Sequence, residues 1–232
     1  MNKQLKKPSK MSWKYVMGEL LLIVFGILIA LYINNLNESR KLKDFENKIV
    51  SEIEKSLTSD YDFHITSRIT RAEQIIQSSE TVLEFLDGKI KYNDSLEIHF
   101  WRISWIVIFE PKSIPFETLK SKGIELISNE DIRKSLLELY DYTYPRINYF
   151  TESFNNWSTN RVEPYCIKNF AINKGDRGKA YKPIDIDQIK NSIEYRNLVF
   201  EKMTKTNRLL GRMNRAKDNV GDLLMQLKKQ KL

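Results

Sequence analysis

The side chains that most often carry chemistry are few in this sequence, beginning with two histidines. His64 follows Asp60 by four residues, which places both side chains on one face of a helix, where they offer two metal ligands. An acid and a histidine at this spacing more often form a surface contact, so we expect no metal site. His99 precedes Phe100 and Trp101 and is expected to be a partly buried, hydrogen-bonded core residue.

Nucleophilic and phosphate-binding motifs give no support for an enzyme. No Ser, His and Asp arrangement can be assigned, and the sequence has no GxxxxGK[ST] loop. The segment NKGDRGK (residues 173–179) lacks the strand before it and the helix after it that a phosphate cradle requires, and we interpret it as a basic loop. Cys166 is the single cysteine, so the chain has no intramolecular disulfide and no thiolate metal cluster. We predict no catalytic residue and no cofactor.

Aromatic residues are dense in one part of the chain. They could line a ligand pocket, as in helical sensor domains, but aromatic residues at this spacing more often form core. We therefore interpret the following five as core: Phe100, Trp101, Trp105, Phe109 and Phe116.

The positive charge lies at the two ends of the chain. The formal net charge is +8, with five lysines against one acid in residues 1–19 and nine basic against three acidic residues in 201–232. Basic ends favour contact with anionic lipid headgroups, whereas a nucleic-acid-binding domain would be basic across its folded surface. We expect a lipid bilayer as a partner and no nucleic acid.

The N-terminal region contains a segment that is long enough to cross a bilayer. Tyr15 to Ile33 supplies 19 residues with Glu19 as the only charge, and about 20 apolar residues are needed. Trp13, Tyr15 and Tyr32 lie where interfacial aromatic residues belong, and no small-x-small cleavage site follows. We predict a basic tail (1–14), a transmembrane helix (15–35) and a helical extramembrane domain (36–232). A core helix of a soluble protein is the alternative.

Lysine and arginine on the two sides of this segment predict its orientation. Five lysines precede it, and four basic residues follow it: Lys3, Lys6, Lys7, Lys10 and Lys14 before, and Arg40, Lys41, Lys43 and Lys48 after. The positive-inside rule then favours a cytoplasmic N-terminus and a periplasmic main domain at a bacterial inner membrane, in a single-pass topology.

Glu19 lies on one narrow stripe of the predicted transmembrane helix with Gly26, Ala30, Ile33 and Asn37. Gly26 and Ala30 form a small-xxx-small pair, which allows a second helix to approach closely. We predict that Glu19, Gly26 and Ala30 form a helix-contact face. The alternative is that Glu19 extends to the headgroup region and contacts no particular partner.

The remaining chain is expected to be all-α. Apolar residues at steps of three and four predict a helix from Leu42 to Leu86 that stops at Gly88, and a closing helix that starts near Asp185 or Asp187. Between them we predict four segments: a core helix over 93–109 ended by Pro111, a short helix from Pro115 to Gly123, a helix opened by a Ser128–Asp131 capping box and bent at Pro145, and an irregular connection over 158–185. Together they form a bundle of long helices.

Two segments resemble an uncharacterised family of single-pass membrane proteins, common in Bacteroidota and described only as a domain of unknown function. They are GELLLIVFGILIALYINNLNESRK near the N-terminus and FEPKSIPFETLKSKGIELISNEDIR further along. Lys122 stands before Gly123, with Ser121 one place earlier, where the family has Ser or Thr. The resemblance implies a helical architecture and residence in a membrane, and it assigns no catalytic residue.

These observations favour a membrane-anchored, non-enzymatic helical protein, a scaffold or accessory subunit. We expect its stem face and long helices to contact another membrane protein or a second copy of the chain. The alternative is a periplasmic sensing or ligand-binding domain that relays a signal through its transmembrane helix, with the output supplied by a partner. An enzyme would require a polar pocket that gathers acids or His64.

Overall fold

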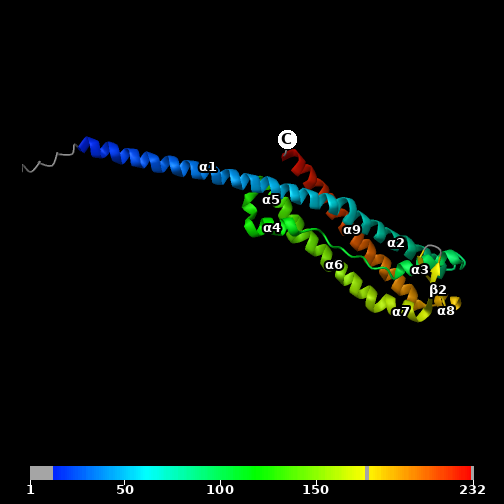
Figure 1. The fold of residues 1–232 in the computed structure, drawn as a ribbon. Coiled ribbons are helices and arrows are strands. Elements are labelled where there is room, and N and C mark those ends of the chain that lie inside the picture. The colour runs from blue at the N-terminus through cyan, green and yellow to red at the C-terminus, as the bar shows by residue number, and fades with distance from the viewer. Residues whose placement is uncertain (1–12, 176–177, 231–232) are drawn as a thin grey trace, which may run out of the picture. The chain divides into compact units, whose positions relative to one another are not determined.

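The structure is a computed structural model that describes residues 13–175 and 178–230. The chain separates into two compact units, residues 1–48 and residues 49–232. The boundary falls inside one helix, because α1 (Trp13–Ser59) begins in the first unit and ends in the second (Figure 1).

The first unit contains the apolar part of α1. This helix is long and apolar enough to cross a membrane: its most apolar 18-residue window has a mean hydropathy of 2.6, and none of that window is buried. The predicted apolar helix is therefore confirmed, and the structure describes α1 from Trp13 onward. Four lysines of the predicted basic tail, Lys3, Lys6, Lys7 and Lys10, lie outside the described residues.

The second unit begins with the rest of the first long helix. A π-helical segment, η1 (Asp60–Ile65), joins α1 to α2 (Thr66–Leu86), so helical structure is continuous as predicted. The helix ends next to Gly88, whose φ of 76° lies in the left-handed region that glycine adopts without strain. The predicted stop is confirmed.

The predicted core helix over 93–109 is wrong in its length. A 3-10 turn, η2 (Asp94–Leu96), is capped by the side chain of Asn93 and leads into α3 (Glu97–Ile103), which has only seven residues. The chain then runs without regular structure to α4 (Ile114–Lys122), and we call residues 104–113 the strap. Pro111 therefore does not end the helix. Side chains of other helices form hydrogen bonds with the N–H and C=O groups of the strap, in place of the hydrogen bonds that a helix would provide.

The next helices match the prediction in order but differ at their ends. They are α4, η3 (Ile124–Leu126), α5 (Glu130–Leu137), η4 (Glu138–Thr143) and α6 (Tyr144–Trp157), and two further helices, η5 (Ser158–Val162) and α7 (Glu163–Asn169), follow them. Gly123 follows α4 with a φ of 112°, as expected for a glycine stop. The cap of α5 is Asn129, whose side chain accepts hydrogen bonds from the N–H groups of Asp131 and Ile132, so the predicted Ser128 capping box is wrong. Pro145 is the second residue of α6 and follows η4 within one continuous helical run. Proline has no N–H to donate to a carbonyl one turn earlier, and the π-helical distortion of η4 lies in that preceding turn.

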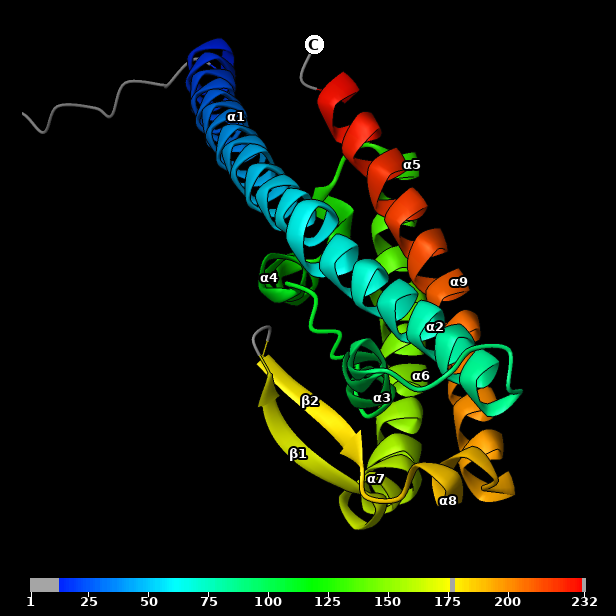
Figure 2. The same ribbon diagram turned by 90° about the vertical axis from the view of Figure 1, so that its right-hand side faces the viewer.

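The predicted irregular connection over 158–185 is also wrong. It contains η5, α7 and an antiparallel hairpin of β1 (Phe170–Gly175) and β2 (Gly178–Pro183), in which Phe170 pairs with Pro183. The closing helix is interrupted as well: α8 (Ile186–Lys190), capped by Asp185, is separate from α9 (Ile193–Gln230). Within the second unit the hairpin, α7 and α8 gather at one end (Figure 2).

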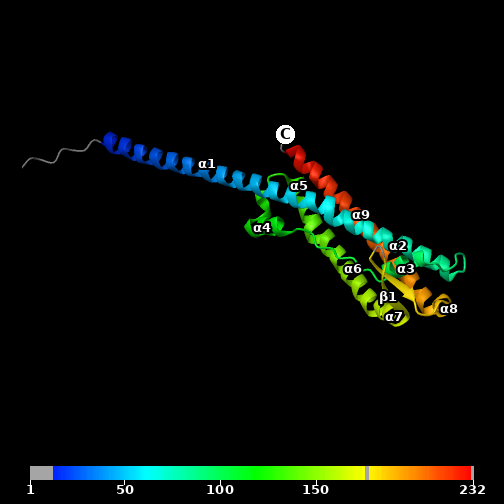
Figure 3. The same ribbon diagram turned by 45° about the vertical axis from the view of Figure 1, so that its right-hand side comes forward.

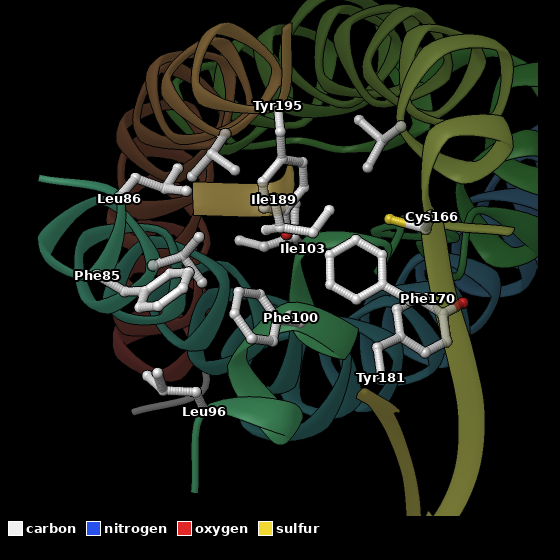
Figure 4. Close-up of a cluster of buried hydrophobic side chains, with 13 residues drawn as sticks. Phe85, Leu86, Leu96, Phe100, Ile103, Cys166, Phe170, Tyr181, Ile189 and Tyr195 are labelled. Carbon is white, nitrogen blue, oxygen red and sulfur yellow. The ribbon is translucent and has the colours of Figure 1, made fainter. Parts of the chain in front are cut away.

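The second unit has a continuous core. Helices α2 and α9 pack along each other, and α3 packs against both α2 and β2. The strap runs from α3 to α4 alongside α6 (Figure 3). Aromatic rings from five elements, α2, α3, β1, β2 and α9, meet at the hairpin end (Figure 4). There Phe100 lies 5.2 Å from Phe170 and 5.8 Å from Phe85 between ring centroids, the latter edge to face. The interpretation of Phe100 as core is confirmed.

Candidate functional site

The predicted helix-contact face lies on the exposed surface of α1. Glu19, Gly26 and Ala30 are all exposed, and a Cβ built on Gly26 would meet no atom within 4 Å. The surface at Gly26 is thus open to a neighbour, and its use as a contact remains a prediction.

The two histidines have different surroundings. His64 is half-buried, whereas Asp60 is fully buried and accepts hydrogen bonds from Lys112 N–H and from the hydroxyl of Tyr144. Among the described residues no group of three or more His, Cys, Asp and Glu is placed to hold a metal ion. His99 contacts the hydroxyl of Ser78 through Nδ1 at 3.1 Å, and burial lowers its pKa. It is the partly buried, hydrogen-bonded histidine that we predicted.

The strap is the most unusual feature of the interior. Val107 is fully buried and Phe109 nearly so, yet this backbone belongs to no helix or sheet. Buried N–H and C=O groups that have no partner are costly, so other groups must bind them. In this structure side chains from η1, α2, α6 and α9 do so.

The hydrogen bonds to the strap follow one another along its backbone. Lys202 Nζ donates to Trp105 O at 2.6 Å, and Arg71 Nε donates to Ile106 O at 2.7 Å. The amide of Asn155 accepts from Val107 N–H at 3.0 Å and donates to Val107 O at 2.6 Å. Arg68 donates to the carbonyl of Ile108, and both carboxylate oxygens of Asp60 accept from Lys112 N–H at 3.2 Å.

Lys202 is fully buried at one end of the strap. Besides Trp105 O, its amine contacts Ser158 Oγ at 2.6 Å and lies 4.3 Å from the ring centroid of Phe154. Burial lowers the pKa of Lys202 to about 7, and among the described residues no carboxylate forms an ion pair with it. Burial also raises the pKa of the neighbouring Cys166 to about 12, so the thiol is neutral.

A hydroxyl can act as a nucleophile when an amine with a lowered pKa lies beside it and serves as the general base. Such a pair needs access to substrate. Ser158 and Lys202 are 1% and 0% exposed, and neither lines a hollow described below. The arrangement therefore fixes the strap against α9 and η5 and is closed to a substrate.

Asp60 is the buried charge near the other end of the strap. Its carboxylate accepts a hydrogen bond from the hydroxyl of Tyr144 at 3.2 Å in addition to the two from Lys112 N–H. Burial is the largest influence on this carboxyl and raises its pKa. Tyr140 lies beside it, edge to face with Tyr144 at 5.2 Å.

Each π-helical segment contains one of the buried polar side chains that lie near the strap. Asp60 opens η1, Tyr140 lies in η4 and Ser158 opens η5. A π-helical turn holds an extra residue and is frequent at functional sites. Here the extra residue of each π-helical turn allows a polar side chain to face the core. The α-helices before and after the turn keep their apolar residues on the side that faces the core.

A second feature is a groove between α6 and α9, which we call the arginine groove. Two hollows of about 250 Å³ and about 190 Å³ share Arg212 in their walls. Four arginines line them: Arg146, Arg208, Arg212 and Arg215. The lining also includes Phe150 and one carboxylate, that of Glu138. This arrangement can bind an anion.

Comparisons with known proteins complete the description of the site. No family model, curated protein or solved structure matches this chain. The resemblance to the Bacteroidota membrane family therefore stays a prediction, and the function must be argued from the residues.

Sequence reasoning did not identify Lys202, Ser158 or the arginine groove. One signal was present for Lys202. The buried positions of α9 recur at alternating steps of four and three, and Lys202 and Thr206 fall within the series: Tyr195, Val199, Lys202, Thr206, Leu209, Met213, Ala216, Val220, Leu223 and Leu227. A lysine in such a series is predicted to be buried.

Proposed function

We propose that this chain is a membrane-anchored, non-enzymatic helical protein that acts by association with another membrane protein or with a second copy of itself. The observation that supports the anchor is the exposed apolar window of α1, of which none is buried. Apolar surface of this extent is unfavourable in water and favourable in lipid, and the length suits a bilayer.

Association through α1 is supported by the open face at Gly26. A helix pair in lipid gains from close packing, and small side chains permit it. Further apolar residues are exposed on elements that lie at the hairpin end of the second unit: Ile167, Ile172, Ile184, Ile186, Ile193 and Phe200. They give a partner a second surface to contact.

The proposed orientation has a cytoplasmic N-terminus and a periplasmic second unit at a bacterial inner membrane. It rests on the five lysines before the apolar window and the four basic residues after it. A reporter active only in the cytoplasm, fused after Leu232, is expected to be silent. An active reporter would reverse the orientation.

The contact face is tested with Gly26→Leu in full-length chains within membranes. We expect crosslinking through α1 to fall several-fold, because a leucine separates helices that pack at a glycine. Gly18→Leu, also exposed on α1 but off the stripe, is the matched control and should crosslink as the wild type does. Equal crosslinking of all three chains would refute the face. Crosslinks to a second copy or to a different membrane protein would identify the partner.

The alternative function is a sensing or ligand-binding domain. The arginine groove is the observation that favours it, because it offers an anion-binding surface within the second unit.

A further inference from the structure

The arginine groove concentrates positive charge that the protein itself does not neutralise. Among the described residues no carboxylate forms an ion pair with any of its four arginines, and Glu138 is the only acid in the lining. Lys205, also in the wall, does have a partner, Glu201, at 3.0 Å. The groove therefore carries a clear excess of positive charge.

Holding these arginines together is unfavourable for the isolated fold. Arg208 and Arg212 are four residues apart on α9, and like charges at that spacing destabilise a helix. Burial lowers the pKa of Arg212, and the positive charges of Arg146, Arg215 and Arg208 lower it further. A bound anion would relieve this repulsion.

Arg212 is held in place at the centre of the groove. Its guanidinium carbon lies 3.6 Å from the ring centroid of Phe150, a cation–π contact, and its Nη1 donates to Arg208 O at 3.0 Å. Its other N–H groups have no partner among the described residues. Across the groove Arg146 donates to the hydroxyl of Tyr142 and lies over that ring at 5.5 Å. These contacts orient the guanidinium groups before any ligand arrives.

The volume of the two hollows limits the size of the anion that they can hold. Each is smaller than the roughly 300–1,000 Å³ typical of sites that enclose a whole ligand. Guanidinium forks match the oxygen pairs of a phosphate, and a dianion is suited to several cations in a small volume. We propose that the arginine groove binds a phosphate group through Arg146, Arg212 and Arg215. The phosphate belongs to a soluble ion or ester, or to a lipid headgroup. This inference goes beyond the proposed function and does not depend on it.

The test uses the full chain in nonionic detergent, with sodium phosphate or sodium chloride at equal ionic strength and pH 7. We expect phosphate to raise the midpoint of thermal unfolding by several degrees, and isothermal titration to show binding. Arg212→Gln should weaken phosphate binding at least tenfold. Arg161→Gln, at an exposed arginine of η5 outside the groove, is the matched control and should bind as the wild type does.

Further variants and lipids complete the test. Arg146→Gln and Arg215→Gln change exposed residues and should weaken binding even if Arg212→Gln does not fold. In nanodiscs of phosphatidylcholine alone, stabilisation by added phosphate indicates a soluble ligand. Stabilisation by phosphatidic acid without added phosphate, lost in Arg146→Gln and Arg215→Gln, indicates a headgroup. The proposal is overturned if neither phosphate nor phosphatidic acid stabilises the protein, or if the groove variants respond as the wild type does.

Discussion

At the scale of single residues, the buried amine of Lys202 and the buried carboxylate of Asp60 are best understood through the backbone they bind. The two groups lie in separate contacts near opposite ends of the strap, Lys202 at Trp105 and Asp60 at Lys112. Burying a charge without an ionic partner is costly. Hydrogen bonds to backbone groups that would otherwise be unsatisfied offset part of this cost.

The lowered pKa of Lys202 predicts a pH dependence of stability. The pKa of Lys202 is about 7 in the fold, and its ordinary value is 10.5. Between these two pH values the lysine of the unfolded chain holds a proton that the lysine of the native chain has released. The contribution of Lys202 to the free energy of unfolding therefore rises with pH across this window, by at most about 1.4 kcal/mol per pH unit.

Lys202→Met tests this dependence. Urea unfolding of the full chain in detergent, followed by tryptophan fluorescence from pH 6.5 to 9.5, should show a free energy that rises less with pH in the variant than in the wild type. Lys228→Met, at an exposed position of the same helix, should keep the wild-type slope. Parallel slopes for wild type and Lys202→Met would show that this amine does not titrate in the window.

At the scale of elements, the π-helical segments explain where the apolar pattern misleads. Steps of four from Leu57 predict Tyr61 as the next buried residue, but Asp60 is buried and Tyr61 is only half-buried. The next buried residue is Ile65, five positions after Asp60, which is the spacing of a π turn. The extra residue restores the stripe that continues through α2.

Deleting a residue from η1 should therefore be tolerated. Removal of Phe63, which is 71% exposed, should convert η1 to an α-helical turn and leave the stripes on both sides in register. Removal of the exposed Glu73 from α2 should rotate every following side chain of that helix by about 100°. We expect cooperative thermal unfolding, measured by circular dichroism, in the first variant and its loss in the second. Loss of cooperative unfolding in the Phe63 deletion, with cooperative unfolding kept in the Glu73 deletion, would refute the role given to η1.

The sequence predicts long elements better than short ones for a physical reason. Helix order, the glycine stops at Gly88 and Gly123 and the apolar part of α1 depend on local patterns, and these were predicted correctly. The strap depends on partners distant in the chain: Arg71 lies 35 positions from Ile106, and Lys202 lies 97 positions from Trp105. A local pattern contains no information about such partners, so the residues after Ile103 predict a helix that does not form. The arginine groove was missed for the same reason, because it joins two helices.

The two units differ in where their apolar residues lie, buried in one and exposed in the other. Within residues 13–175 and 178–230 every buried hydrophobic residue lies from Ile49 onward, in the second unit, while the apolar window of the first unit is exposed. We expect lipid to cover only that window. The core and the charged surface of the second unit then predict a domain that requires no detergent.

Residues 41–232, expressed without the apolar window, should therefore fold in water. We expect recovery in the soluble fraction and a single cooperative unfolding transition, because the chain keeps the whole core from Ile49 to Leu227. The full chain should instead remain with the membrane pellet after a wash at alkaline pH, as an apolar helix in lipid does. Gly26→Leu is the matched full-length control and should stay in the pellet, since it changes the contact face and keeps the window apolar. A soluble full chain would refute the anchor, and a shortened chain that stays in the pellet would show a membrane-binding surface within the second unit.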